Sequence, residues 1–155
     1  MKRHPSLQPL SRDHHEALVQ VQTLRPAAVG GPDERRVARA RFRDLWDGWF
    51  RDHLGLEERW LPPLIPESDD VDRLREEHEE IRSLAEAFVR GAAEAEPARA
   101  LMLRLAERLH DHIRWEERQL FPAIEQAAGA EELRFLGAET KTAETGRPRS
   151  CRPKP

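Results

Sequence analysis

Two stretches of the chain place histidine and glutamate at the same spacing in an apolar setting. HLGLEERWLPPLI begins at His53 and HIRWEERQLFPAI begins at His112; both carry His, Glu, Glu, Arg, Leu, Pro and Ile at matching positions. A His and a Glu four residues apart lie one turn apart on the same helix face. The pairs are therefore His53 with Glu57 and His112 with Glu116. Burying an imidazole and a carboxylate is unfavourable unless something compensates, and a bound cation does so because both groups are then ligands.

Two further histidines lie on apolar stripes without a glutamate partner. His78 shares its stripe with Leu74 and Ile81, and SRDHHEAL offers His14 and His15. On a helical wheel His14 falls near the middle of the inward face and His15 near its edge, which favours His14, with His15 as the alternate. Any one of these histidines alone is more often a packed or solvated residue than a ligand.

Apolar residues at three- and four-residue steps, bounded by Pro, Gly and N-cap residues, predict the elements that position these side chains. The predicted helices cover about 9–25, 33–61, 68–91 and 97–128, followed by a short helix in AEELRFLG. We expect an all-α fold, an antiparallel up-down four-helix bundle with a short extra C-terminal helix. The predicted bundle spans 1–137, and residues 138–155 are predicted to be a disordered tail.

In such a bundle the starts of the first and third helices lie beside the ends of the second and fourth. His14 and His78 are near helix starts, and His53 and His112 are near helix ends, so all four can fall in one layer. Four imidazoles and two bridging carboxylates suit two transition-metal ions. Nitrogen and oxygen ligation without thiolate favours two non-haem iron ions, with manganese or zinc as alternatives. A single zinc ion is the weaker interpretation, since zinc usually takes fewer ligands.

Other polar residues near the motifs receive less specific expectations. Glu58 and Glu117 follow the motif glutamates and turn away from the stripe, so they should be solvated or support the ligands from behind. His110 lies on nearly the opposite helix face from His112, which indicates a surface position. Trp46, Trp49 and Trp115 are expected to pack in the core and to keep the site dry.

At these residues the sequence resembles the hemerythrin-like HHE cation-binding domains. The resemblance rests on SRDHHEAL, HLGLEERWLPP, REEHEEI and HIRWEERQLFP and covers roughly residues 7–126. It implies a four-helix bundle with a non-haem di-iron site, terminal ligands His14 (or His15), His53, His78 and His112, and bridges Glu57 and Glu116. Members of the family bind oxygen, sense oxygen or redox state, handle iron, or meet peroxide and nitric oxide.

The sequence departs from the oxygen-carrying members of that family at one position. They carry a second histidine one turn before the third-helix ligand, and this chain has Leu74 there. One metal ion would then lack a terminal ligand. This weighs against a pure oxygen-carrier role and favours exogenous ligands or redox chemistry.

Bulk composition excludes several other classes of protein. The chain has 155 residues, a net charge of −3 and one cysteine, Cys151, so it offers neither a basic nucleic-acid surface nor an internal disulfide. It has no signal-peptide pattern and no apolar run of membrane-spanning length. We expect a cytoplasmic protein that contacts no nucleic acid and no membrane, with an unknown protein partner.

Three functions compete on the sequence alone. The first is a di-iron protein that binds oxygen or a related small ligand such as peroxide or nitric oxide for sensing, stress response or iron handling. The second is a di-iron enzyme that turns over peroxide or nitric oxide; the sequence leaves enzyme activity open, with ligand binding favoured. The third is a metal-free helical interaction module whose histidines are packed.

Overall fold

The computed structural model describes residues 2–91 and 96–147, and all regular structure in this part of the chain is helical. Each long unbroken helix is called a rod below, and two of the rods contain a five-residue π-helical turn. The elements are α1 (Gln8–Val29); α2 (Pro32–Leu45), η1 (Trp46–Phe50) and α3 (Arg51–Trp60); η2 (Pro62–Leu64); α4 (Ser68–Arg90); α5 (Glu96–Trp115), η3 (Glu116–Leu120) and α6 (Phe121–Ala127); and α7 (Ala130–Gly146). The fold class predicted from periodicity, all-α, is confirmed.

The predicted helix ends at proline and glycine residues agree with the structure, with one exception. The rod that ends in α3 stops before Pro62, as predicted, but α1 does not stop at Pro26 and continues to Val29. Proline removes one backbone hydrogen bond, and only the last turn of α1 lies beyond it. Leu24 and Ala28 are both fully buried, so packing of one apolar face carries that turn past the proline.

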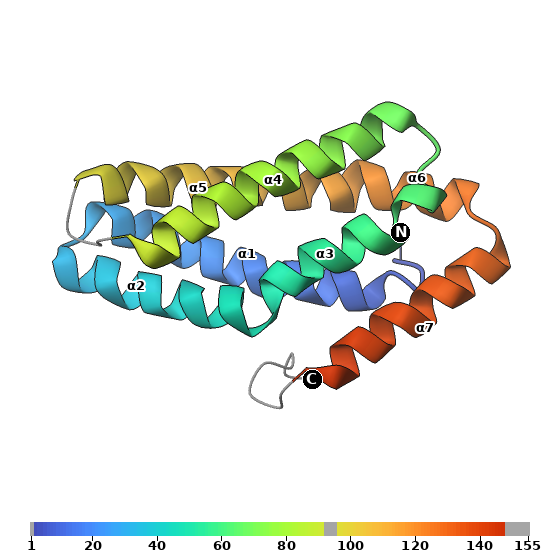
Figure 1. The fold of residues 1–155 in the computed structure, drawn as a ribbon, viewed down its shortest axis with the longest axis horizontal. Coiled ribbons are helices and arrows are strands. Elements are labelled where there is room, and N and C mark those ends of the chain that lie inside the picture. Colours follow the sequence, from blue (N-terminus) through green and yellow to red (C-terminus); the bar gives the residue numbers. More distant parts are fainter. Residues whose placement is uncertain (1, 92–95, 148–155) are drawn as a thin grey trace.

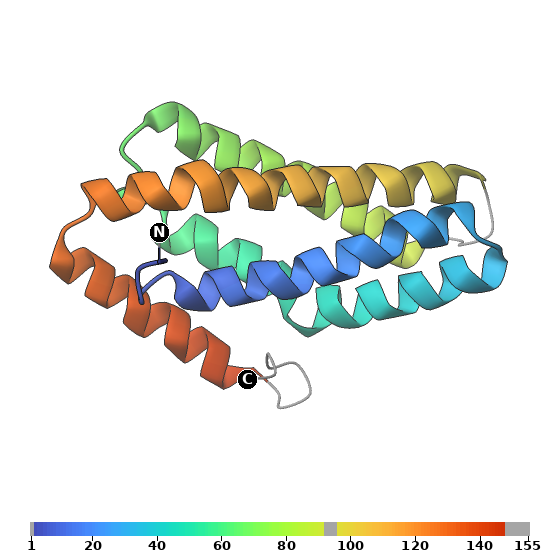
Figure 2. The same ribbon diagram turned by 180° about the vertical axis from the view of Figure 1, so that it is seen from behind.

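The long helices α1, α2–η1–α3, α4 and α5–η3–α6 lie side by side along the length of the molecule (Figures 1 and 2). α1 packs against α2 and α5, and α4 packs against α5, α2 and α3. The buried apolar residues form two clusters. One is built around Phe42, Trp46 and Phe88; the other, at the end where η2 lies, is built around Leu61, Trp115 and Phe121. The candidate site lies between these clusters.

The helix after Gly129 is longer than predicted. α7 runs obliquely across one end of the rods and contacts α1 (Figure 1). The prediction of a disordered segment from residue 138 is wrong for residues 138–146, because Thr140 is buried and its hydroxyl donates to the Ser6 carbonyl at 3.3 Å. Residues 148–155, the rest of the predicted tail, lie outside the described residues. None of the described helices is long and apolar enough to cross a membrane.

Candidate metal centre

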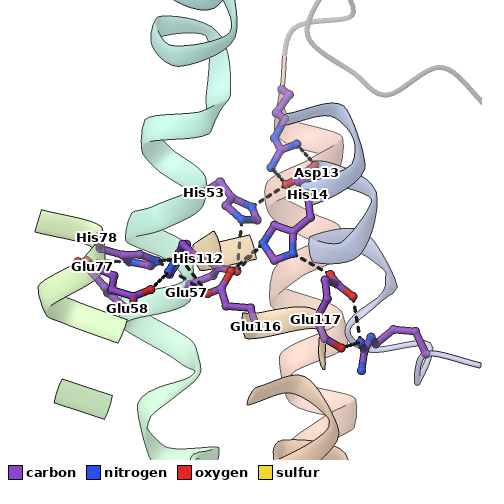
Figure 3. Close-up of polar contacts among 12 residues, drawn as sticks. Asp13, His14, His53, Glu57, Glu58, Glu77, His78, His112, Glu116 and Glu117 are labelled. Carbon is purple, nitrogen blue, oxygen red and sulfur yellow. Dashed lines mark hydrogen bonds and ion pairs between the residues drawn. The ribbon is translucent and has the colours of Figure 1, made fainter. Parts of the chain in front are cut away.

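Six of the seven predicted site residues come together in one layer of the core (Figure 3). Each of the six is at most 2% exposed: His14, His53, Glu57, His78, His112 and Glu116. The seventh, His15, is exposed on the outer side of α1. His110 is likewise at the surface, where its Nδ1 lies 3.0 Å from Asp111.

The layer exists because polar residues interrupt the apolar stripe of every rod at the same depth. On α4, Leu74 belongs to one apolar cluster, Ile81 belongs to the other, and His78 lies between them. On α1, Leu10 and Ala17 flank His14 in the same way. The two clusters therefore close the layer from above and below and keep it dry.

The four histidines form two pairs, His14 with His53 and His78 with His112. The two central carboxylates, Glu57 and Glu116, each face both pairs. Glu57 Oε1 lies 3.3 Å from His14 Nε2 and 3.2 Å from His53 Nε2. The other oxygen, Glu57 Oε2, lies 3.4 Å from His78 Nε2. Each glutamate oxygen thus faces a different pair, as a bridging carboxylate would.

Glu116 repeats this arrangement from the opposite rod. Its Oε2 lies 3.1 Å from His14 Nε2, and its Oε1 lies 3.3 Å from His112 Nε2 and 3.8 Å from His78 Nε2. Two sets of close nitrogen and oxygen atoms result, Glu57 with His78, His112 and Glu116, and His14 with His53 and Glu57. Glu57 belongs to both sets.

Behind the histidines stand four outer carboxylates, one at each Nδ1. Asp13 lies 2.9 Å from His53 and Glu117 lies 2.7 Å from His14. The remaining two pairs are Glu58 with His78 at 3.0 Å and Glu77 with His112 at 2.8 Å. A supporting role was predicted from the sequence for Glu58 and Glu117, but not for Asp13 and Glu77. The available signal was an acidic residue directly before a candidate ligand, in RDHH and REEHEE.

The outer carboxylates form a closed circuit between rods. Asp13 of α1 contacts the histidine of α3, Glu58 of α3 contacts the histidine of α4, and Glu77 of α4 contacts the histidine of α5. Glu117 of η3, which continues α5, contacts the histidine of α1 and so closes the circuit. An arginine pairs with each outer carboxylate in turn: Arg147 with Asp13, Arg82 with Glu58, Arg73 with Glu77 and Arg3 with Glu117.

These contacts favour one tautomer of each neutral imidazole, the one protonated at Nδ1. An Nδ1–H that donates to a carboxylate leaves the Nε2 lone pair of a neutral imidazole pointing inward. His78 Nε2 and His112 Nε2 lie only 3.0 Å apart, so two inward lone pairs would repel each other. A cation between the converging atoms removes the repulsion.

Buried polar atoms without hydrogen-bond partners also indicate a site for a cation. His53 Nε2 and all four oxygens of Glu57 and Glu116 lack a hydrogen-bond partner among the described residues. Buried polar atoms are rarely left without partners. The donor set is nitrogen and carboxylate oxygen without sulfur, which fits iron, manganese or zinc.

Without a metal, protons must neutralise the layer. Burial would lower the pKa of His14, but the negative charge of Glu116 and the contacts with Glu116, Glu117 and Glu57 together outweigh burial and raise that pKa well above its usual range. Burial would also lower the pKa of His78, but Glu116, Glu57 and Glu58 together raise it well above its usual range. Burial would raise the pKa of Glu57, yet His53 and the other imidazoles hold it well below its usual range.

Two of the three tryptophans that were predicted to keep the site dry contact the layer. Trp49 meets the His53 ring edge-on at 6.1 Å, and Trp115 lies 5.9 Å from the His112 ring. Trp46 packs instead in the cluster with Phe42, and its indole N–H donates to Glu86 at 2.7 Å. The π-helical turns also lie close to the layer, as such turns often do at functional sites, since η3 begins at Glu116.

Comparison with known proteins agrees with this geometry. Residues 69–144 match the model of the hemerythrin HHE cation binding domain. The match contains His78, His112 and Glu116, while His14, His53 and Glu57 join them through the fold. Searches of curated proteins and of solved structures gave no significant match. In residues 69–144, the chain is therefore similar to the hemerythrin HHE cation-binding domain family.

Proposed function

We propose that this chain is a cytoplasmic non-haem di-iron protein that binds oxygen or a related small ligand such as peroxide or nitric oxide, for sensing, stress response or iron handling. The scaffold in this proposal is an antiparallel up-down four-helix bundle. Its terminal ligands are His14, His53, His78 and His112, and its bridges are Glu57 and Glu116.

One observation carries the proposal. Each central carboxylate presents one oxygen to each histidine pair, at 3.1–3.8 Å from the Nε2 atoms. A mononuclear site needs no such division of oxygens between two nitrogen pairs. Two cations also suit the charge, because the two central carboxylates face imidazoles alone among the described residues, whereas the four outer carboxylates already pair with arginines.

The protein residues have separate tasks in this function. Glu57 and Glu116 hold the negative charge between the two positions, and the outer carboxylates keep the imidazoles oriented by accepting their Nδ1 protons. Trp49 and Trp115 exclude water from the two sides. Iron, when bound, supplies a redox-active Lewis acid that takes the small ligand.

Metal content and an absorption spectrum test the proposal directly. Protein from iron-replete cells should contain about two iron ions per chain and absorb in the near ultraviolet in air through ligand-to-iron charge transfer. A colourless protein that also refuses ferrous iron under anaerobic reconstitution would refute it and leave a helical interaction module. Added peroxide then separates the enzyme from the binding protein, because only an enzyme consumes it repeatedly.

A further inference from the structure

The end of α7 reaches the metal centre through a single arginine. Arg147, the residue after α7, donates from Nη1 to Asp13 Oδ1 at 2.6 Å and from Nη2 to Asp13 Oδ2 at 2.5 Å. Asp13 Oδ2 also accepts from His53 Nδ1 at 2.9 Å. Arg147 and His53 therefore share one carboxylate, although 94 positions separate them in the sequence (147 − 53).

Asp13 depends on this arginine more than the other outer carboxylates depend on theirs. Its side chain is 3% exposed, against 13% for Glu77, 24% for Glu117 and 27% for Glu58. A buried carboxylate without a paired cation is strongly unfavourable. Two parallel N–H···O bonds also fix the carboxylate plane, which a single contact does not.

The arginine is itself held in place at the boundary with solvent. Its guanidinium lies 4.8 Å from the Trp49 ring, and Trp49 packs on His53. A cavity of about 300 Å³ opens here between the α3 rod and the end of α7, lined by residues that include Trp49, Asp52, His53, Ala143, Gly146 and Arg147. Movement of Arg147 would open Asp13 to this cavity, which His53 already lines.

We propose that Arg147 is a positioning residue that fixes His53 through Asp13, so that the end of α7 determines how firmly the His14–His53 half of the centre retains its metal ion. Loss of Arg147 leaves Asp13 free to rotate or to take up water. His53 then loses its fixed ring orientation toward Glu57. The metal part of this inference rests on the proposed di-iron function; the positioning of His53 does not.

Substitution of Arg147 with a matched control tests the metal part. Arg147→Met removes the charge and keeps an unbranched apolar stem, and Arg147→Lys keeps the charge without the two-point contact. Arg12→Met is the control, because Arg12 also joins α1 to α7, but its side chain is 47% exposed and its guanidinium pairs with Glu144, at 2.9 Å. Zinc is the probe, and its release to a chelator is the readout.

We expect one of two zinc ions to leave roughly tenfold faster from Arg147→Met, the size of effect usual for a group behind a metal-bound histidine. Arg147→Lys should fall between that variant and the parent, and Arg12→Met should release zinc as the parent does. Equal release from Arg147→Met and Arg12→Met overturns the metal part. If Arg147→Met does not fold, Arg147→Lys against Arg12→Met decides, with any acceleration confined to Arg147→Lys as support and equal release as refutation.

A metal-free readout tests the positioning alone. In protein labelled with ¹⁵N-histidine, the Nδ1–H signal of His53 is identified by its loss in His53→Gln. It should be protected from exchange in the parent and in Arg12→Met, and should broaden or exchange rapidly in Arg147→Met. Unchanged protection refutes the positioning role. A parent that binds no zinc or iron but shows the Arg147-dependent signal would refute the di-iron function while supporting the positioning of His53.

Discussion

Glu117 Oε1 lies 2.7 Å from His14 Nδ1, on the far side of the imidazole from Glu116. Two consecutive glutamates thus hold one histidine from both of its nitrogens, Glu116 facing Nε2 and Glu117 facing Nδ1. Glu57 and Glu58 act in the same way on His78. The repeated Glu-Glu pair of the sequence therefore has a structural reason, because the first glutamate points into the layer and the second supports a histidine of another rod from behind.

Replacing a central carboxylate should remove metal. We expect Glu57→Gln or Glu116→Gln to lower iron content from about two ions per chain to one or fewer, because a neutral amide neither bridges two cations nor balances their charge. Metal analysis with the absorption spectrum measures this. Glu79→Gln, at an exposed position of α4, is the control. Full iron content in both folded variants would contradict the bridging role.

Replacing an outer carboxylate should weaken metal binding without abolishing it. Glu77 holds the Nδ1 of His112, so Glu77→Gln should reduce metal affinity by roughly 10- to 100-fold. A competitive zinc titration with a chromophoric chelator measures the change. The preceding Glu76 is exposed, and Glu76→Gln should titrate like the parent. Equal affinities of the two variants would show that the Glu77–His112 contact has no effect on binding.

Much of the fold was predictable because its information is local. The apolar stripes that contain His53, His78 and His112 indicate that these segments are helical and which helix face points inward. Pro62 marks a helix end in the structure, as predicted. The outer carboxylates were harder to predict because each pairs with a histidine on another helix. Asp13 is adjacent to His14 in sequence yet binds His53, and periodicity along one helix carries no information about that partner.

The length of α7 was missed for a related reason. Only Leu133, Leu136 and Thr140 of α7 are buried, so its apolar face is too sparse to stand out. Contacts with distant residues such as Ser6 stabilise the helix, and these are visible only in the folded chain. The same applies to Pro26, where burial of Ala28 outweighs the local tendency of proline to end a helix.

A histidine at position 74 should add a ligand. Leu74 is fully buried one turn before His78 on the same face. Leu74→His should destabilise the metal-free protein by about 1–3 kcal/mol, because a polar ring is then buried without a partner. Zinc should recover most of that loss, as measured by urea unfolding with and without the ion. Leu74→Asn is equally polar but a poorer ligand, so a similar recovery by zinc in that variant would argue against coordination.

Two glycines should respond oppositely to alanine. A Cβ at Gly137 would lie 3.2 Å from Ser6 Cα and 2.9 Å from Ser6 Oγ, whereas a Cβ at Gly55 meets nothing within 4 Å. Gly137→Ala should therefore destabilise the protein by about 1–3 kcal/mol through overpacking of α7 against the N-terminal segment. Gly55→Ala should stabilise it by about 0.5–1 kcal/mol through helix propensity. Thermal unfolding of both metal-free variants measures the two shifts, and a stabilised Gly137→Ala protein would show that α7 does not pack this closely.

Stability of the metal-free and metal-loaded proteins should diverge as pH rises. The pKa values of folded His14 and His78 lie above their usual 6.5, so the stabilisation from these imidazolium ions is present below pH 6.5 and lost as pH rises through the raised values. The pKa of Glu57 lies below its usual 4.5, so its contribution is present above pH 4.5 and lost as pH falls through the lowered value. The metal-free protein should therefore be most stable between these limits.

Metal binding displaces those imidazole protons and strengthens as pH rises, so the difference in Tm between zinc-loaded and metal-free protein should grow from about pH 5.5 to about pH 8. His14→Gln should flatten the decline of the metal-free protein, while His110→Gln, at a partly exposed position outside the layer, should leave both curves unchanged. Calorimetry across this pH range measures the curves. Parallel curves for the two forms would mean that the buried imidazoles neither hold protons without metal nor give them up to it.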